Sequence, residues 1–258
     1  RVLGSASPAS PSPLHPVAGA NDIFVAQFTT KEWIGDVLAY KIDPNTGQIP
    51  KDITWSAQAR LELADWTKRK IYYNSPSAKA LKTFDLTNLN GDGLAFHFDK
   101  FCSQTGAGGA AAPSQCASLA DKTDANTASN LIDYLRGDQT KPYYRKRTKR
   151  LGDIINASPL FVGKPAFKYT ENNYPKFASD NASRTPVVLA AANDGMLHAF
   201  DRTTGDELWA YIPTAVLPEL RKLADDNFMT AHQYYVDGSP QIADVYDAGA
   251  SKWKTIVI

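Results

Sequence analysis

The segment from Asn88 to Asp99 carries oxygen-bearing side chains at the spacing of a calcium-binding loop. Loop positions one, three, five and twelve are occupied by Asn88, Asn90, Asp92 and Asp99. Calcium loops use such oxygens, with a glycine like Gly93 at position six, where the loop turns sharply. The first position is Asn where Asp is usual, and the last is Asp where a bidentate Glu is usual, so the site carries little charge. An ordinary polar turn between Phe84 and Phe96 is the preferred interpretation.

A basic segment lies between Lys141 and Arg150. Its sequence, KPYYRKRTKR, holds six basic residues and two tyrosines, and basic residues interleaved with aromatic rings are one mark of nucleic-acid contact. The formal net charge of the whole chain is only +1, so no broad positive field supports that function. We interpret the segment as a solvated face or a protected strand edge, and we expect no nucleic-acid partner.

The tripeptide Arg136-Gly137-Asp138 is the sequence that integrins read in host adhesive proteins. So short a motif also arises by chance. Gly137 is expected to end a helix as its C-terminal cap. Integrin-type binding through these three residues is therefore a hypothesis with a structural alternative.

Two cysteines, Cys102 and Cys116, flank a loop of low complexity, SQTGAGGAAAPSQ. They do not form a CxxC pair, and no histidine cluster accompanies them, so their spacing does not indicate a metal site. Two cysteines that bracket a loop with little packing of its own predict a disulfide in an oxidising compartment.

The sequence contains no GxSxG, no HExxH and no phosphate-cradling loop. His198 falls within an expected strand, where a structural role is favoured over catalysis. We therefore predict no catalytic residue in this chain. No apolar run approaches the length of a membrane span, so none is predicted.

Short strands joined by tight turns are expected to position these side chains. Strands are predicted at 187–192, 196–201 and 207–212, with turns at Asn193-Asp194-Gly195 and Arg202–Asp206. Such a meander, with Asp-x-x-Thr-Gly before a Trp, is typical of a propeller blade, and residues 158–162 supply its innermost strand. Trp209 is expected to be buried between neighbouring blades.

The blade pattern recurs along the chain. Leu38–Gly47 is similar to Leu197–Gly205, and each copy continues to a strand with a Trp, which indicates an internal repeat. A further hairpin is predicted within Asp237–Ile258, and helices are predicted within 119–135 and from Pro218. The predicted fold is mainly β: a partial β-propeller with quinoprotein-like four-stranded blades and helical and loop insertions.

Two regions are distinguished by composition and pattern. Residues 1–20 are rich in Ser, Pro and Ala, which predicts an extended linker. Residues 21–258 are expected to be the N-terminal part of a propeller that stops within a blade, because about two blades and a hairpin are fewer than closure requires.

An ordered series of motifs points to a known family. The series comprises Leu131–Asp138, Arg145–Arg147, Leu151–Pro159, Asn193–Phe200 and Val236–Pro240. It resembles the PilY/PilC family of type IV pilus biogenesis factors and pilus-tip adhesins. The resemblance implies a non-catalytic protein that supports pilus assembly, retraction control and adhesion. It implies export to the outer membrane, pilus tip or cell surface of a Gram-negative bacterium.

The same resemblance bears on partners and cofactors. The implied partners are minor pilins and other pilus-tip components, together with host-surface receptors. The family's calcium site is expected beyond Ile258, so no cofactor is expected within this chain.

Two other classes share the blade pattern. Quinone-dependent dehydrogenases have Asp-x-x-Thr-Gly-x-x-x-Trp blades but resemble one another in a vicinal cysteine pair, whereas Cys102 and Cys116 are fourteen positions apart. A propeller scaffold for outer-membrane assembly shares the blades but not the run from Leu135-Arg136-Gly137-Asp138 to Leu151-Gly152-Asp153. The pilus factor is therefore the preferred interpretation.

Overall fold

The computed structural model describes residues 3–5, 22–49, 51–103 and 112–258. Most of the expected linker, residues 1–20, lies outside the described residues. Within it, Leu3–Ser5 form strand β1, which pairs antiparallel with β2 (Asp22–Thr29). At least this part of the segment therefore belongs to a sheet.

The first sheet has four antiparallel strands in the order β1-β2-β3-β4. Strand β3 spans Ile34–Lys41, and β4 is the short strand Trp55–Ser56. Buried and less buried residues alternate along β2 and β3, because successive side chains of a strand point to opposite faces. One face of this sheet therefore packs on the rest of the molecule.

The central sheet has six strands in the order β6-β5-β10-β9-β8-β7. Their bounds are β5 (Ile71–Ser75), β6 (Ala80–Thr83), β7 (Leu160–Val162), β8 (Val187–Ala192), β9 (Met196–Asp201) and β10 (Glu207–Ile212). Strands β7 to β10 form the antiparallel meander that the sequence predicts.

The expected four-stranded blade is not a separate unit. Strand β10 also pairs with β5 in parallel, and β5 pairs with β6, so the sheet continues past the fourth strand. The backbone groups on the outer edge of β10 are satisfied by a hairpin from much earlier in the chain, which removes an open sheet edge. A two-stranded sheet, β11 (Ile242–Asp247) with β12 (Lys252–Val257), follows the central sheet.

The helices are short. The α-helices are α1 (Ala57–Leu63), α2 (Leu86–Gly91), α3 (Ala128–Arg136) and α4 (Tyr174–Asp180). The 3-10 helices are η1 (Trp66–Lys68), η2 (Ala95–His97), η3 (Ser114–Ala117), η4 (Glu171–Asn173), η5 (Thr214–Ala224) and η6 (Asp226–Met229).

Two helix predictions need correction. The helix predicted within 119–135 is confined to α3, and the helix predicted from Pro218 begins earlier, at Thr214, as a 3-10 helix. The predicted cap is confirmed: Gly137 has φ 121° and donates its N–H to the carbonyls of Asp133 and Tyr134. A positive φ of this kind favours glycine at a helix end.

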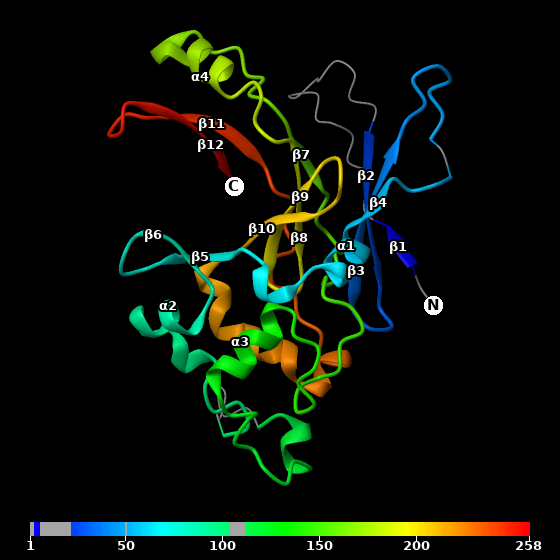
Figure 1. Ribbon diagram of the computed structural model, residues 1–258, viewed down its shortest axis with the longest axis vertical. Helices are drawn as coiled ribbons and strands as arrows, with labels where there is room; N and C mark the ends of the chain where they lie inside the picture. The colour runs from blue at the N-terminus through cyan, green and yellow to red at the C-terminus, as the bar shows by residue number, and fades with distance from the viewer. Residues whose placement is uncertain (1–2, 6–21, 50, 104–111) are drawn as a thin grey trace.

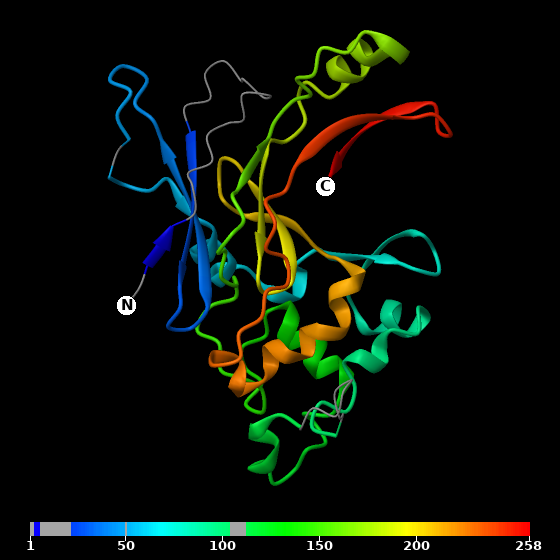
Figure 2. The same ribbon diagram turned by 180° about the vertical axis from the view of Figure 1, so that it is seen from behind.

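Three groups of elements surround the central sheet (Figures 1 and 2). The first sheet lies along one side of it, with Phe24 stacked on Phe161 at a centroid distance of 6.2 Å. Helices α2, α3 and η5 lie at one end, where Ile71 and Ile212 enter a common apolar core with them. Strands β11 and β12 extend from the other side, close to α4. No helix among the described residues has the length and apolar character needed to cross a membrane.

Candidate functional site

Two turns built in the same way confirm the internal repeat. In the turn after β3, Gly47 N–H donates to the Asp43 carbonyl (2.8 Å), and the Asp43 carboxylate accepts from Asn45 N–H (2.7 Å). In the turn after β9, Gly205 N–H donates to the Asp201 carbonyl (2.9 Å), and the Asp201 carboxylate accepts from the amides of residues 203 and 204. The two glycines have φ 68° and 74°.

A tryptophan from the first sheet, Trp55, packs on the second turn. Trp55 is only 4% exposed, and its indole N–H donates to the Arg202 carbonyl at 2.8 Å. A Cβ atom on Gly205 would lie 2.6 Å from the Trp55 ring, so only glycine fits there. Trp209, which the sequence predicts to be buried, is instead half-buried, packed at the edge of a small apolar cluster that contains Leu189 and Ala199.

Four ionisable side chains form a cluster in the middle of the protein, closed off from solvent. His198, on β9, lies 2.7 Å through Nδ1 from Glu207 Oε1 and 3.1 Å through Nε2 from both Asp194 carboxylate oxygens. Arg69 donates two hydrogen bonds to the Glu207 carboxylate, from Nε (2.7 Å) and Nη2 (2.8 Å). The four side chains are at most 6% exposed. The cluster thus joins β9, β10, the 193–195 turn and the segment before β5.

The charges of this cluster balance. Burial alone lowers the pKa of His198, but Asp194 and Glu207 outweigh it and raise the pKa to about 9. Burial raises the pKa of Glu207, but Arg69 and then His198 outweigh it and hold that pKa well below its usual range. The pKa of Asp194 is likewise lowered, with His198 outweighing its burial. At neutral pH two cations therefore face two anions.

A second polar group continues the cluster. The backbone N–H of Gly152 donates to Asp194 Oδ2 at 3.0 Å, and the Asn193 side chain donates to Asp153 Oδ2 at 2.8 Å. His232 Nε2 lies 3.0 Å from both Asp153 oxygens. The Leu-Gly-Asp and Asn-Asp-Gly motifs, which are forty residues apart, therefore contact each other directly.

Trp33 covers this second group. Its ring stacks on His232 with centroids 3.8 Å apart, and its indole N–H donates to the Met229 carbonyl at 3.0 Å. Trp33 has φ 51°, which is strained for a bulky side chain. These contacts hold the hairpin between β2 and β3 against the segment after η6.

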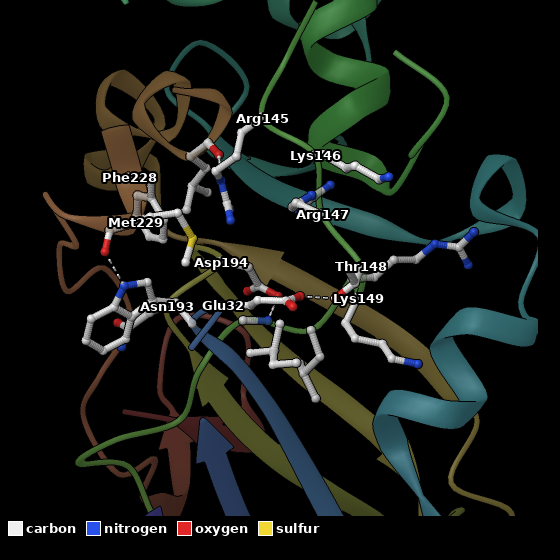
Figure 3. Close-up of a pocket in the computed structure, with 16 residues that line it drawn as sticks. Glu32, Arg145, Lys146, Arg147, Thr148, Lys149, Asn193, Asp194, Phe228 and Met229 are labelled. Carbon is white, nitrogen blue, oxygen red and sulfur yellow. Dashed lines mark hydrogen bonds between the residues drawn. The ribbon is translucent and has the colours of Figure 1, made fainter. Parts of the chain in front are cut away.

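Residues 145–150 of the basic segment line a small cavity of about 30 Å³ beside these groups (Figure 3). Arg145 donates to the Leu223 carbonyl at 2.8 Å and lies 4.6 Å from the centre of the Phe228 ring. Arg147 donates to the Tyr134 carbonyl, and its guanidinium lies 4.2 Å from the centre of the Tyr134 ring. These arginines fasten α3 to the segments η5 and η6, in place of the expected solvated face.

Arg150 completes this set of contacts. It donates to the carbonyls of Leu61, Ala64 (2.7 Å) and Gly137 (3.0 Å). The first two carbonyls lie at the C-terminal end of α1, where helix carbonyls lack partners and a cation is favourable. Lys146 is the one basic residue of the segment that is exposed, and the others are half-buried or buried.

The Arg136-Gly137-Asp138 tripeptide is held by its own neighbours. Arg136 donates to the carbonyls of Phe84 (3.0 Å) and Arg69 (3.2 Å). Asp138 is 5% exposed, and it accepts bonds from the Thr140 N–H (2.9 Å) and hydroxyl (2.6 Å). Integrin-type binding would need these bonds to break, because the two charged side chains are not free on a loop.

The segment weighed as a calcium loop, with a polar turn as the preferred interpretation, forms helix α2 and the short helix η2 instead. Asn88 and Asn90 lie in α2, which begins there because Asp85 caps it by accepting from Asn88 N–H at 2.9 Å. Asp92 accepts from Lys82 (2.8 Å), and bonds from Lys82, Ser77 and Tyr73 hold its pKa well below its usual range. Asp99, after η2, accepts from the next backbone N–H. No group of three His, Cys, Asp or Glu side chains in the described chain could hold a metal ion.

The two cysteines are joined in the structure. The sulfurs of Cys102 and Cys116 are 2.00 Å apart and the Cα atoms 5.4 Å apart. Both residues are buried beside Phe101 and Leu131 in the core that contains α3.

The arrangement described above holds segments together and offers little for catalysis. Each member of the central cluster bonds to another member, and water has almost no access to any of them. A general acid or base must instead reach a substrate proton within hydrogen-bond distance. Among the residues singled out in the sequence, His198 and Asp194 belong to this cluster, whereas the sequence did not indicate that Arg69 and Glu207 would be their partners. The one available signal was a set of charged residues inside an apolar strand pattern.

Residues 151–258 match the family model described as PilY1 beta-propeller domain. A type IV pilus biogenesis factor PilY1 homolog of Xylella fastidiosa is 34% identical over 247 residues, covering 91% of this chain and 17% of the relative. The type IV pilus biogenesis factor PilY1 of Pseudomonas aeruginosa strain UCBPP-PA14 is 33% identical over 237 residues, covering 88% and 19%.

The chain therefore spans less than a fifth of the length of these curated relatives. No solved structure matches it significantly. The contacts between the Leu-Gly-Asp and Asn-Asp-Gly motifs fall within the matched region 151–258. The resemblance seen in the sequence is confirmed: the chain is similar along about nine tenths of its length to type IV pilus biogenesis factors named PilY1, and residues 151–258 match the family's beta-propeller domain.

Proposed function

We propose that this chain is a non-catalytic part of a type IV pilus biogenesis factor and acts through surface contact rather than turnover. The observation that carries the proposal is its similarity, along 88–91% of its length, to proteins named type IV pilus biogenesis factor PilY1. The closed charge cluster supports it, because its four ionisable side chains bond to one another rather than facing a cleft.

The finer proposal concerns place and partners. The protein is exported and acts at the outer membrane, pilus tip or cell surface of a Gram-negative bacterium. There it contacts minor pilins and other tip components, opposes pilus retraction and contributes to adhesion, with host-surface receptors as further partners. A bonded cysteine pair supports an oxidising compartment outside the cytoplasm.

The test is genetic. Deletion of the whole gene should reduce surface pili, twitching motility and adhesion to host cells, and the intact gene should restore all three. If the protein opposes retraction, deleting the retraction motor as well should bring surface pili back while twitching stays absent. Unchanged piliation and adhesion in the deletion strain would refute the proposal.

A biochemical measurement addresses the main alternative. Purified full-length protein should show no quinone-dependent oxidation of alcohols or sugars when supplied with quinone cofactor and calcium. Turnover above that of a heat-treated sample would favour the dehydrogenase over the pilus factor.

A further inference from the structure

The small cavity beside the central cluster, about 30 Å³ in volume, is formed by segments that lie far apart in the sequence. Its walls come from residues 32–34, 145–152, 193–194, 223 and 228–229. Figure 3 shows Arg145 and Arg147 along one wall, with Asp194 and Glu32 across from them. The cavity therefore has one strongly basic wall.

The positive charge around this cavity is not balanced by its carboxylates. Five basic residues line it, against the two carboxylates of Glu32 and Asp194. Asp194 is already paired with His198, and Glu32 accepts a hydrogen bond from the Thr148 hydroxyl. The three arginines of residues 145–150 donate to backbone carbonyls, and in the described part of the chain none of them forms an ion pair.

Arg147 also has a buried donor without a partner. Its Nη2 donates to the Tyr134 carbonyl, but its Nε is buried and has no hydrogen-bond partner among the described residues. Such an orphaned donor is rare in a folded protein, and it is costly on a charged group. Arg145 is close by: burial lowers the pKa of Arg145, and the positive charge of Arg147 also lowers it. An acceptor with a negative charge would satisfy the Nε donor and offset both cations.

We propose that this cavity binds a single halide-sized anion, such as chloride or bromide, which accepts a hydrogen bond from Arg147 Nε. The size of the cavity selects a monatomic ion, because about 30 Å³ holds roughly one or two water molecules and leaves no room for a tetrahedral oxyanion such as phosphate. Phe228 and Met229 give the cavity an apolar side. This side favours the larger halides, since the cost of removing an ion from water falls as its radius grows. Bromide and chloride should therefore bind more tightly than fluoride.

A water molecule is the alternative occupant. Water could accept the hydrogen bond from Arg147 Nε, but it would leave the excess positive charge of the basic wall in place. An anion removes that excess and joins the basic segment to the hairpin between β2 and β3 and to η6. These are the parts that Trp33 already connects, through its indole N–H to the Met229 carbonyl.

Hydrogen exchange of the full-length protein at constant ionic strength tests this site. Sodium gluconate is replaced stepwise by sodium bromide, chloride or fluoride, and mass spectrometry follows exchange in peptides that cover residues 29–34 and 145–152. Bromide and chloride should slow exchange there by about threefold once their concentration reaches about twice the dissociation constant, because a ligand that binds only the closed state opposes local opening. Fluoride and gluconate should have much less effect.

Two variants separate a specific site from general attraction of anions. Arg147→Met removes the Nε donor and its charge, and it should abolish the effect of bromide. Lys146→Met is the matched control, because it removes the charge of a neighbouring residue that is exposed; it should keep the effect of bromide. In crystals of the wild type grown in sodium bromide, the anomalous scattering of bromine should give one peak in the cavity, within hydrogen-bond distance of Arg147 Nε.

Three results would overturn the proposal. They are equal protection by all four salts, a bromide effect that Arg147→Met keeps or that both variants lose, and electron density in the cavity without a bromine peak, which would identify a water molecule. If Arg147→Met does not fold, the halide series and the bromine signal of the wild type still decide the question.

Discussion

Replacement of His198 by glutamine tests whether charge balance holds the central cluster together. In the wild type His198 is a buried cation between Asp194 and Glu207, and Arg69 is the other cation. His198→Gln keeps a polar side chain of similar reach but removes the charge. Two carboxylates then face one guanidinium, and a buried, unpaired charge costs about 3–5 kcal/mol of unfolding free energy.

The pH dependence gives a second, independent magnitude. The pKa of His198 rises from 6.5 in the unfolded chain to about 9 in the folded protein. Because the pKa is raised on folding, protonated His198 stabilises the folded protein fully below pH 6.5, and this stabilisation is lost as the pH rises through about 9. The difference between these values corresponds to roughly 3 kcal/mol at 1.36 kcal/mol per pH unit. On the acid side, Asp194 and Glu207 have lowered pKa values, so their contribution is lost as the pH falls below about 4.

Urea unfolding from pH 6 to pH 10 measures both effects. The wild type should lose about 3 kcal/mol between pH 6.5 and 9.5, and His198→Gln should start lower and lose much less over that range. His97→Gln is the matched control, because burial lowers the pKa of this partly exposed histidine. The His97→Gln variant should therefore lose as much stability at alkaline pH as the wild type does.

A double variant distinguishes charge from packing. His198→Gln with Glu207→Gln returns the cluster to one cation, Arg69, and one anion, Asp194, so about half of the lost stability should return. If the double variant were as unstable as the sum of the two single variants, charge balance would not be the cause. An unchanged alkaline slope in His198→Gln would refute the assignment of the slope to this residue.

Three further outcomes follow from the structure and are measured by the same unfolding assay. Gly205→Ala should lower the free energy of unfolding by about 2–5 kcal/mol, because Gly205 has a positive φ and the added Cβ atom would clash with the indole ring. Gly47→Ala, with open space around it, should lower that free energy by only about 1–2 kcal/mol. Equal losses would argue against the ring contact. Cys116→Ser should lower stability by about 3 kcal/mol, and non-reducing mass spectrometry of the wild type should find the crosslinked peptide; two free thiols in secreted protein would contradict this. Arg150→Lys should cost about 2 kcal/mol, because one ammonium cannot replace the guanidinium at three carbonyls, whereas the exposed Lys146→Met should stay within about 0.5 kcal/mol.

The sequence alone determined the elements whose causes are local. The bounds of β8, β9 and β10 are those predicted, because apolar runs and turn residues such as Asn193-Asp194-Gly195 act over a few positions. The Asp43 and Asp201 turns were visible for the same reason, since each aspartate bonds to amides two and three residues ahead. The family resemblance rests on these same short motifs.

The sequence near residues 88–99 also held a local signal, although the prediction for this segment left two alternatives open. The segment 88–99 was weighed as a calcium loop or a polar turn, and Asp85 at the start of α2 was the residue that could have indicated a helix. Its carboxylate caps the helix and fixes the backbone of Asn88 and Asn90 in a conformation in which a calcium loop cannot form.

Only the tertiary structure decided what the charged residues do. The basic segment 141–150 looks like a solvated face in the sequence, but its arginines donate to carbonyls that lie up to 89 positions away. Arg69 donates a hydrogen bond to Glu207, which lies 138 positions later in the sequence. Likewise, the parallel pairing of β10 with β5 joins segments that no local pattern relates. Hydrogen bonds and ion pairs act over about 3 Å in space regardless of sequence separation, so the fold must exist before such partners can be named.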